Sequence, residues 1–204
     1  MRRRGARGFT LIELLVVLAV LGILLGMAVW GSHATLRRWQ SWRGAQQLAD
    51  DLREAQARAE RGGGYVLSQG ALVTARSFLV FEVAEQRYAL FDWHDSDGDG
   101  RPEEGESRRT WTRELPPHVN FGWQAGIDLK ACGNSAGAPG GSVTFATAGY
   151  PPCNGRPCIK FDQQGFSNMG PGAIYLRDGE QSFAVSGTRA GHFTVCQWTG
   201  RQWR

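Results

Sequence analysis

The chain has 204 residues and a formal net charge of +4 at pH 7. Four arginines and no acid lie in residues 1–8, and the rest of the chain balances 19 basic against 19 acidic side chains. The balanced charge of residues 9–204 gives no reason to expect a protein that binds polyanions such as nucleic acids over its whole surface. The length suits one domain of ordinary size beside a terminal segment.

The first predicted element is the apolar run from Gly8 to Trp30, which contains a single charge, Glu13. Residues 9–30 are long enough, at about 1.5 Å per residue, to cross a hydrocarbon core of about 30 Å. The arginines before the run predict a cytoplasmic N-terminus and an exported C-terminal part. Because a lone carboxylate in lipid costs about 2–4 kcal/mol, Glu13 is expected to have a partner.

The same helix is expected to continue through residues 31–61, where apolar residues recur at steps of three and four. They are Leu36, Trp39, Trp42, Ala45, Leu48, Leu52, Ala55 and Ala59. The glycines at 62–64 predict its end. The alternative is an independent anchor, a linker and a separate helix, but no Pro/Gly/Ser-rich linker divides the two halves.

From residue 65 to 204 the pattern changes to period two, which is typical of short strands. Strands are expected at Tyr65–Gln69, Ser77–Val83, Arg87–Trp93, Arg108–Leu115, Val119–Trp123, Ser142–Thr147, Cys158–Asp162, Ala173–Arg177, Gln181–Gly187 and His192–Trp198. A helix followed by antiparallel strands predicts an α+β fold, with the sheet packed on the amphipathic half of the helix.

The four cysteines, Cys132, Cys153, Cys158 and Cys196, all lie in the part predicted to be exported. An even number in an oxidising compartment favours two disulfides, for which three pairings exist. We favour Cys153–Cys158, which closes the turn CNGRPC, together with Cys132–Cys196, which ties a loop to the last strand. A zinc site is the alternative, although the spacing lacks paired CxxC knuckles.

An acidic segment, DSDGDGRPEEGE, covers Asp95–Glu106 and matches a twelve-residue calcium loop, with Gly100 at the tight turn. The predicted ligands are Asp95, Asp97, Asp99, the Arg101 carbonyl, Glu103 and Glu106. Hard oxygen ligands suit calcium, which would have a structural role. A plain solvated hairpin is the alternative, because the flanking segments are predicted to be strands.

Catalytic motifs are not apparent. The four histidines are scattered, and no GxSxG, HExxH or phosphate-binding loop occurs. We therefore expect no enzymatic activity, with a membrane-anchored periplasmic enzyme as the alternative.

The residues GFTLIE at the start of the apolar run resemble the class III signal of type IV pilins and of the pseudopilins of type II secretion. In that family a prepilin peptidase cuts after the glycine and methylates the new amino terminus. The resemblance implies a leader of residues 1–8, cleavage between Gly8 and Phe9, and N-methylation of Phe9. It also implies that Glu13 pairs with the amino terminus of a neighbouring subunit, and that an inner-membrane assembly platform is a further partner.

Later segments are similar to the GspH/FimT branch of minor pilins and pseudopilins, namely residues 48–69, 159–176 and 184–203. The resemblance implies a non-catalytic minor pilin that takes part in type IV pilus assembly, in fibre priming or a tip complex, motility, adhesion or DNA uptake. The alternative is a GspH-like minor pseudopilin of type II secretion; the unbroken run ELLVVLAVLGIL favours the pilus. Both imply a single-pass protein of the bacterial inner membrane with a periplasmic domain, later a fibre subunit.

Some minor pilins of this branch bind DNA through a C-terminal Gly-Arg-x-Arg motif. The matching stretch here, residues 191–194, reads GHFT and lacks both arginines. The nearby GRQWR is basic and aromatic, as single-strand binding sites can be. A DNA-binding pilin for natural transformation is thus a further alternative, with Arg201 and Arg204 as contacts, against a tryptophan that simply packs on the sheet.

Overall fold

The computed structural model describes residues 10–61, 66–68, 71–73, 77–99, 101–133, 140–145, 150–162, 164–167, 169–179 and 181–204. The predicted leader and the Gly8–Phe9 cleavage site lie outside these residues. The chain comprises two compact units, Met1–Gln40 and Ser41–Arg204.

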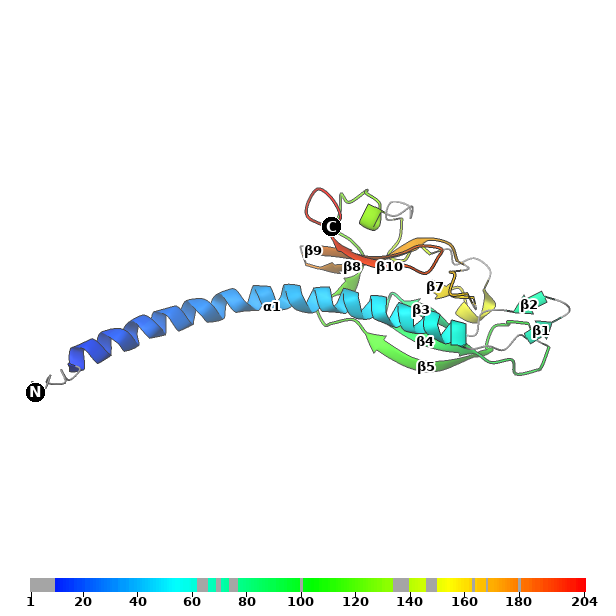
Figure 1. The fold of residues 1–204 in the computed structure, drawn as a ribbon, viewed down its shortest axis with the longest axis horizontal. Coiled ribbons are helices and arrows are strands. Elements are labelled where there is room, and N and C mark those ends of the chain that lie inside the picture. The colour runs from blue at the N-terminus through cyan, green and yellow to red at the C-terminus, as the bar shows by residue number, and fades with distance from the viewer. Residues whose placement is uncertain are drawn as a thin grey trace, which may run out of the picture. The chain divides into compact units, whose positions relative to one another are not determined.

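Helix α1 is continuous from Leu11 to Arg61 and belongs to both units (Figure 1). At its start the amide of Glu13 donates a hydrogen bond to Thr10 Oγ1 at 3.3 Å, so Thr10 caps the helix. The predicted continuity as far as Arg61 is confirmed, and the glycines at 62–64 that predict the helix end lie outside the described residues. Within the described residues, none of the helices combines the length and the apolar character needed to span a membrane. The crossing of a membrane by residues 9–30 stays a prediction.

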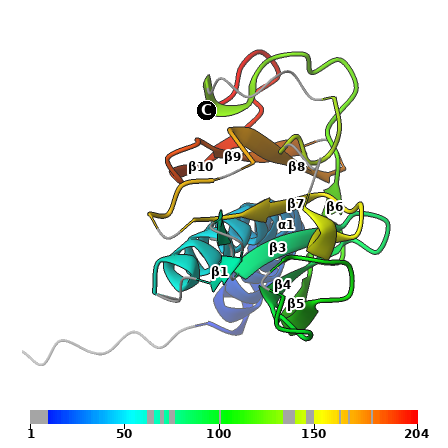
Figure 2. The same cartoon turned by 90° about the vertical axis from the view of Figure 1, so that its right-hand side faces the viewer.

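The strands form two four-stranded antiparallel sheets and one small hairpin (Figure 2). One sheet has the order β5-β4-β3-β7, and the other has the order β10-β9-β8-β6. The first contains β3 (Ser77–Glu82), β4 (Arg87–Trp93), β5 (Ser107–Glu114) and β7 (Cys158–Lys160). The second contains β6 (Asn120–Phe121), β8 (Gly172–Asp178), β9 (Gln181–Gly187) and β10 (Phe193–Gln197). The hairpin pairs β1 (Val66–Ser68) with β2 (Ala71–Val73), and 3₁₀ turns lie at Ala131–Gly133 and Pro151–Cys153.

The predicted α+β fold is confirmed, and most expected strands are present within a few residues of their predicted bounds. The expected strand at residues 142–147 is reduced, among its described residues, to a single bridge between Val143 and Ile174. Strand β2 was not expected. The division into two sheets was also not predicted, because a period-two pattern identifies strands but not their partners.

The core lies between the C-terminal part of α1 and both sheets. Ala45, Leu48, Leu52, Ala55 and Ala59 are buried in one cluster with residues of β3, β4, β7, β8, β9 and β10. This confirms most of the predicted amphipathic face. The prediction was wrong for Leu36 and Trp39, which are 51% and 54% exposed. Apolar spacing alone does not show where the partner surface of a helix ends.

Candidate functional site

Glu13 lies on the exposed N-terminal part of α1. Its carboxylate makes no ion pair with any residue that the structure describes. The apolar side chains around it, from Leu11 to Met27, are exposed as well. A surface of this kind is typical of a segment that is covered by lipid or by other chains.

Three of the predicted calcium ligands come together in the loop between β4 and β5. One carboxylate oxygen from each of Asp95, Asp97 and Asp99 lies within 4.8 Å of the others. Each aspartate also holds the loop backbone. Asp95 accepts from the Gly98 amide at 2.7 Å, Asp97 from the Asp99 amide at 3.0 Å, and Asp99 from the Arg101 amide at 2.7 Å. Hard oxygens at this separation fit a divalent cation such as calcium.

Glu106, the predicted bidentate ligand, has a different role in the structure. It is buried, and it does not belong to the group of aspartate oxygens found among the described residues. Oε1 accepts from the amide and hydroxyl of Ser96 at 2.9 and 3.0 Å, and Oε2 accepts from Trp93 Nε1 and the Glu103 amide, each at 3.2 Å. The amide of Ser96 is the main cause of a lowered pKa at Glu106. This carboxylate therefore closes the base of the loop, and the residues fit a calcium site built on the three aspartates.

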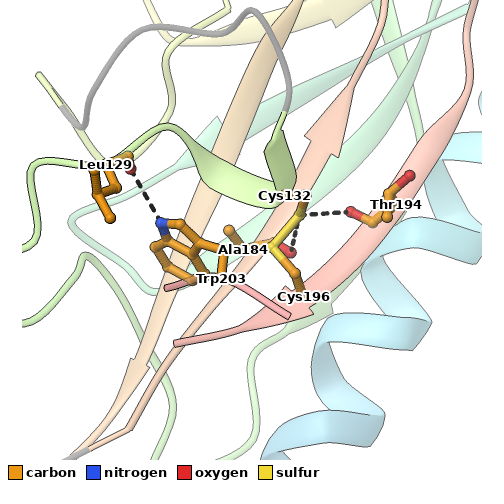
Figure 3. Close-up of a disulfide and its surroundings, with 6 residues drawn as sticks. All are labelled: Leu129, Cys132, Ala184, Thr194, Cys196 and Trp203. Atoms are coloured by element: carbon orange, nitrogen blue, oxygen red, sulfur yellow. Dashed lines mark hydrogen bonds between the residues drawn. A yellow bond between two sulfur atoms is a disulfide. The ribbon is translucent and has the colours of Figure 1, made fainter. Parts of the chain in front are cut away.

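The two disulfides are the pairings favoured from the sequence. Cys132 pairs with Cys196 and Cys153 with Cys158. Figure 3 shows the first bridge between the turn at residue 132 and strand β10, beside Ala184 and Thr194. Trp203 lies on the same side and donates from Nε1 to the Leu129 carbonyl at 3.0 Å (Figure 3). The bridge and this hydrogen bond hold one loop against the last strand.

Arg201 and Arg204, the predicted DNA contacts, are exposed on a hairpin that returns along β10. The side chain of Trp203, between them in the sequence, packs against the domain. Its ring contacts Tyr175 and Trp198, with centroids 5.8 and 5.5 Å apart. The two cations are thus accessible, but the aromatic ring that would stack on a base is already packed.

Sequence reasoning missed two carboxylates that hold the domain together. Asp51 on α1 accepts hydrogen bonds from Tyr88 at 2.7 Å and Gln47 at 3.0 Å, and pairs with Arg113 at 2.8 Å. Desolvation by burial raises its pKa in spite of these partners. An acid three residues after Leu48, on the buried face of the helix, was a signal that could have identified it.

The second carboxylate is Glu82, at the end of β3. It pairs with Arg87, with Arg109 at 3.0 Å and with Arg156 at 2.8 Å, and its side chain is almost fully buried. Arg109 and Arg156 also lie over the ring of Phe91, at 5.2 and 5.5 Å from its centroid. The arginines come from segments far apart in the chain, so no local pattern could have predicted the cluster.

No curated protein matches this sequence. A minor pseudopilin, EpsH, from the type 2 secretion system of Vibrio cholerae is 10% identical, with a TM-score of 0.45 over 76% of this chain and 95% of that one. Residues 3–29 match the family described as the prokaryotic N-terminal methylation motif. The match confirms that the chain resembles type IV pilin-like proteins, and it includes both Gly8–Phe9 and Glu13.

Proposed function

We propose that this chain is a minor pilin, a non-catalytic structural subunit that takes part in assembly of a type IV pilus. The match of residues 3–29 to the prokaryotic N-terminal methylation motif carries the proposal. The resemblance of GFTLIE to the pilin signal implies that such processing precedes assembly. The continuous helix supports the proposal, since one element runs from the motif into the core of the β-rich domain.

The proposed protein begins in the bacterial inner membrane, with its N-terminus in the cytoplasm and its β-rich domain in the periplasm. The prepilin peptidase cuts between Gly8 and Phe9 and methylates Phe9. Two disulfides are consistent with an oxidising compartment. The subunit then joins other pilins through the N-terminal part of α1 and enters the fibre from the inner-membrane assembly platform.

In our proposal, Glu13 directs the docking of the subunit onto other pilins. A carboxylate without an ionic partner in the described chain is costly in an apolar bundle, and an amino terminus of a neighbouring subunit would remove that cost. Exposed apolar side chains on either side would supply the rest of the contact.

The test is the Glu13→Ala variant of the full-length chain, expressed in its own cells. We expect the variant to reach the membrane and form both disulfides, but to be lost from sheared filaments. The matched control is Glu54→Ala, which removes a half-exposed acid of the same helix whose single ion pair among the described residues is with Arg58, one turn away. Normal incorporation of Glu13→Ala into filaments would overturn the proposal.

A minor pseudopilin of type II secretion is the alternative. The two roles differ in what is lost when the chain is removed. An in-frame deletion that abolishes surface pili and leaves protein secretion intact supports the pilus. Loss of secretion with normal pili supports the pseudopilin.

We also propose that the loop of Asp95, Asp97 and Asp99 binds calcium in the periplasm and so fixes the β4–β5 connection. Calorimetry of the full-length chain with calcium chloride tests this. We expect heat of binding at millimolar calcium or below, lost in Asp97→Asn. Glu104→Gln, which changes an exposed acid of the same loop, serves as the control. No heat for the unmodified chain would remove the calcium proposal.

DNA binding at the C-terminal hairpin is the further alternative, favoured by the exposure of both arginines. It predicts that Arg201→Ala combined with Arg204→Ala weakens retention of single-stranded DNA in a gel shift. Unchanged retention would exclude this hairpin as the contact.

A further inference from the structure

Strand β5 is an open edge of its sheet. Among the described residues it pairs only with β4, and its eight residues make it the longest of the described strands. Figure 1 shows it at the outer side of the β5-β4-β3-β7 sheet. The other edges are short or covered: β7 has three residues, β6 has two, and Gln197 of β10 exchanges two backbone hydrogen bonds with Arg204, at 2.6 and 3.0 Å.

The register identifies which backbone groups of β5 face outward. The Leu115 amide donates to the Gln86 carbonyl and the His94 amide to the Glu106 carbonyl, so both ends of the ladder are fixed. Antiparallel pairs alternate between inward and outward groups, and the register shift that leaves Thr110 without a partner in β4 moves this alternation by one residue. The amides and carbonyls of Ser107, Arg109, Thr112 and Glu114 therefore point away from β4. No described residue forms a backbone hydrogen bond with these four.

Arginines give this edge a positive charge. Arg108, Arg109 and Arg113 lie on β5, with Glu114 as its single acid. Ion pairs with Glu82 and Asp51 fix the guanidinium groups of Arg109 and Arg113, although these side chains remain 44% and 45% exposed. Arg108 is exposed and makes no ion pair within the described residues.

The charge decides between two occupants of the edge. Pairing of β5 with β5 of a second copy would bring the arginines of both chains into one ladder, and like charges across strands are destabilising. An extended segment that carries acids would instead satisfy both the outward backbone groups and the arginines. We propose that β5 binds an extended acidic segment of a neighbouring protein by strand addition. The identification of that neighbour as another fibre subunit rests on the proposed function.

The probe is an eight-residue peptide of alternating glutamate and valine, matched in length to β5, with a lysine–valine peptide as its counterpart. Binding to the full-length chain in detergent micelles is followed by amide hydrogen exchange and by titration at low and high salt. We expect the acidic peptide to slow exchange at Arg109, Thr112 and Glu114, and to bind less tightly as salt rises. The lysine peptide should do neither.

Two variants separate backbone pairing from charge. Thr112→Pro removes one outward amide and leaves the ladder with β4 intact, so binding should weaken about tenfold, whereas Thr112→Val should bind normally. Arg108→Glu should weaken binding about tenfold, whereas Arg201→Glu, the same charge change on the C-terminal hairpin, should have no effect.

Equal binding of both peptides, or acidic-peptide binding without protection of β5, would overturn the inference. So would protection of β5 that needs no peptide and grows with protein concentration, since that result identifies a second copy as the occupant. The assembly test is independent. If the acidic peptide protects β5 but the Glu13→Ala variant still enters filaments, only the proposed function is contradicted. If the peptide does not protect β5 but entry into filaments depends on Glu13, only this inference is contradicted.

Discussion

The two parts of α1 differ in where their partners lie. In Ser41–Arg61 the apolar side chains are buried against both sheets, whereas in Leu11–Met27 they are exposed. Residues 11–27 form an apolar run broken by Glu13, whereas residues 41–61 have apolar residues mainly at steps of three and four. The difference teaches that the apolar face of one part is covered within the chain, whereas the described residues leave the apolar side chains of the other part exposed.

Two of the acids of this helix, Asp51 and Glu13, repeat the contrast. Asp51 has three partners within 3.0 Å, all in the same compact unit. Glu13 has no ionic partner among the described residues. A change at Asp51 should therefore alter folding, and a change at Glu13 should alter assembly.

The largest difference is expected for a matched pair of leucines. Leu52 is fully buried, and Leu14 is 56% exposed. Leu52→Ala should lower the free energy of unfolding by about 2–5 kcal/mol, because it leaves a cavity in the core. Leu14→Ala should change it by less than about 0.5 kcal/mol. Urea unfolding of the full-length chain in micelles, followed by tryptophan fluorescence, measures both; equal losses would contradict the comparison.

Asp51→Ala should cost about 2 kcal/mol, since the buried hydroxyl of Tyr88 and the guanidinium of Arg113 lose their acceptor. Combination with Tyr88→Phe should recover part of this cost, because the unsatisfied hydroxyl is then removed as well. Glu13→Ala should leave unfolding unchanged in the same measurement. A loss of stability in Glu13→Ala as large as in Asp51→Ala would show that Glu13 also has a partner within the chain.

The contributions of two buried carboxylates to stability should depend on pH in opposite directions. The pKa of Asp51 is raised above its ordinary value of 3.8, so its contribution to stability is present below that value and is lost as pH rises through the raised pKa. The pKa of Glu106 is lowered from 4.5, so its contribution is present above 4.5 and is lost as pH falls through the lowered pKa.

Unfolding of the unmodified chain, Asp51→Asn and Glu106→Gln between about pH 3 and pH 7 measures both contributions. The free energy of unfolding of the unmodified chain should exceed that of Asp51→Asn by less as pH rises. It should exceed that of Glu106→Gln by less as pH falls. The same slope for both variants would contradict the assignment.

The smallest effect is expected at two glycines of α1. A Cβ at Gly44 would lie 2.9 Å from Pro116 Cγ, whereas a Cβ at Gly22 would meet nothing within 4 Å. Alanine in place of glycine usually stabilises a helix by about 1 kcal/mol, but the contact with Pro116 should cancel most of this gain in Gly44→Ala. The melting temperature of Gly44→Ala should therefore stay nearly unchanged or fall. Gly22→Ala should not lower it. A clear rise in Gly44→Ala would show that Pro116 moves aside easily.

Local patterns predicted much of this fold. The three- and four-residue steps of apolar residues identified the helix to Arg61, and period-two runs located most strands. The closeness of Cys153 to Cys158 in the chain favoured a bridge that the structure contains. Such features depend on neighbours in sequence.

The remaining features depend on contacts between distant segments. β7 pairs with β3, and the bridge at Val143 joins β8, although no local signal assigns these partners. Glu106 illustrates the same limit at the candidate site. Its position in the acidic segment matched a calcium ligand, but the indole of Trp93 and the backbone of Ser96 use both of its oxygens.

The bridge between Cys132 and Cys196 has a consequence for biogenesis. Its two cysteines are 64 residues apart, and the second lies in the last strand. The bond therefore cannot close until nearly the whole of the β-rich unit has been synthesised. Free thiols at these positions would therefore identify molecules in which the loop at residue 132 is not yet tied to strand β10.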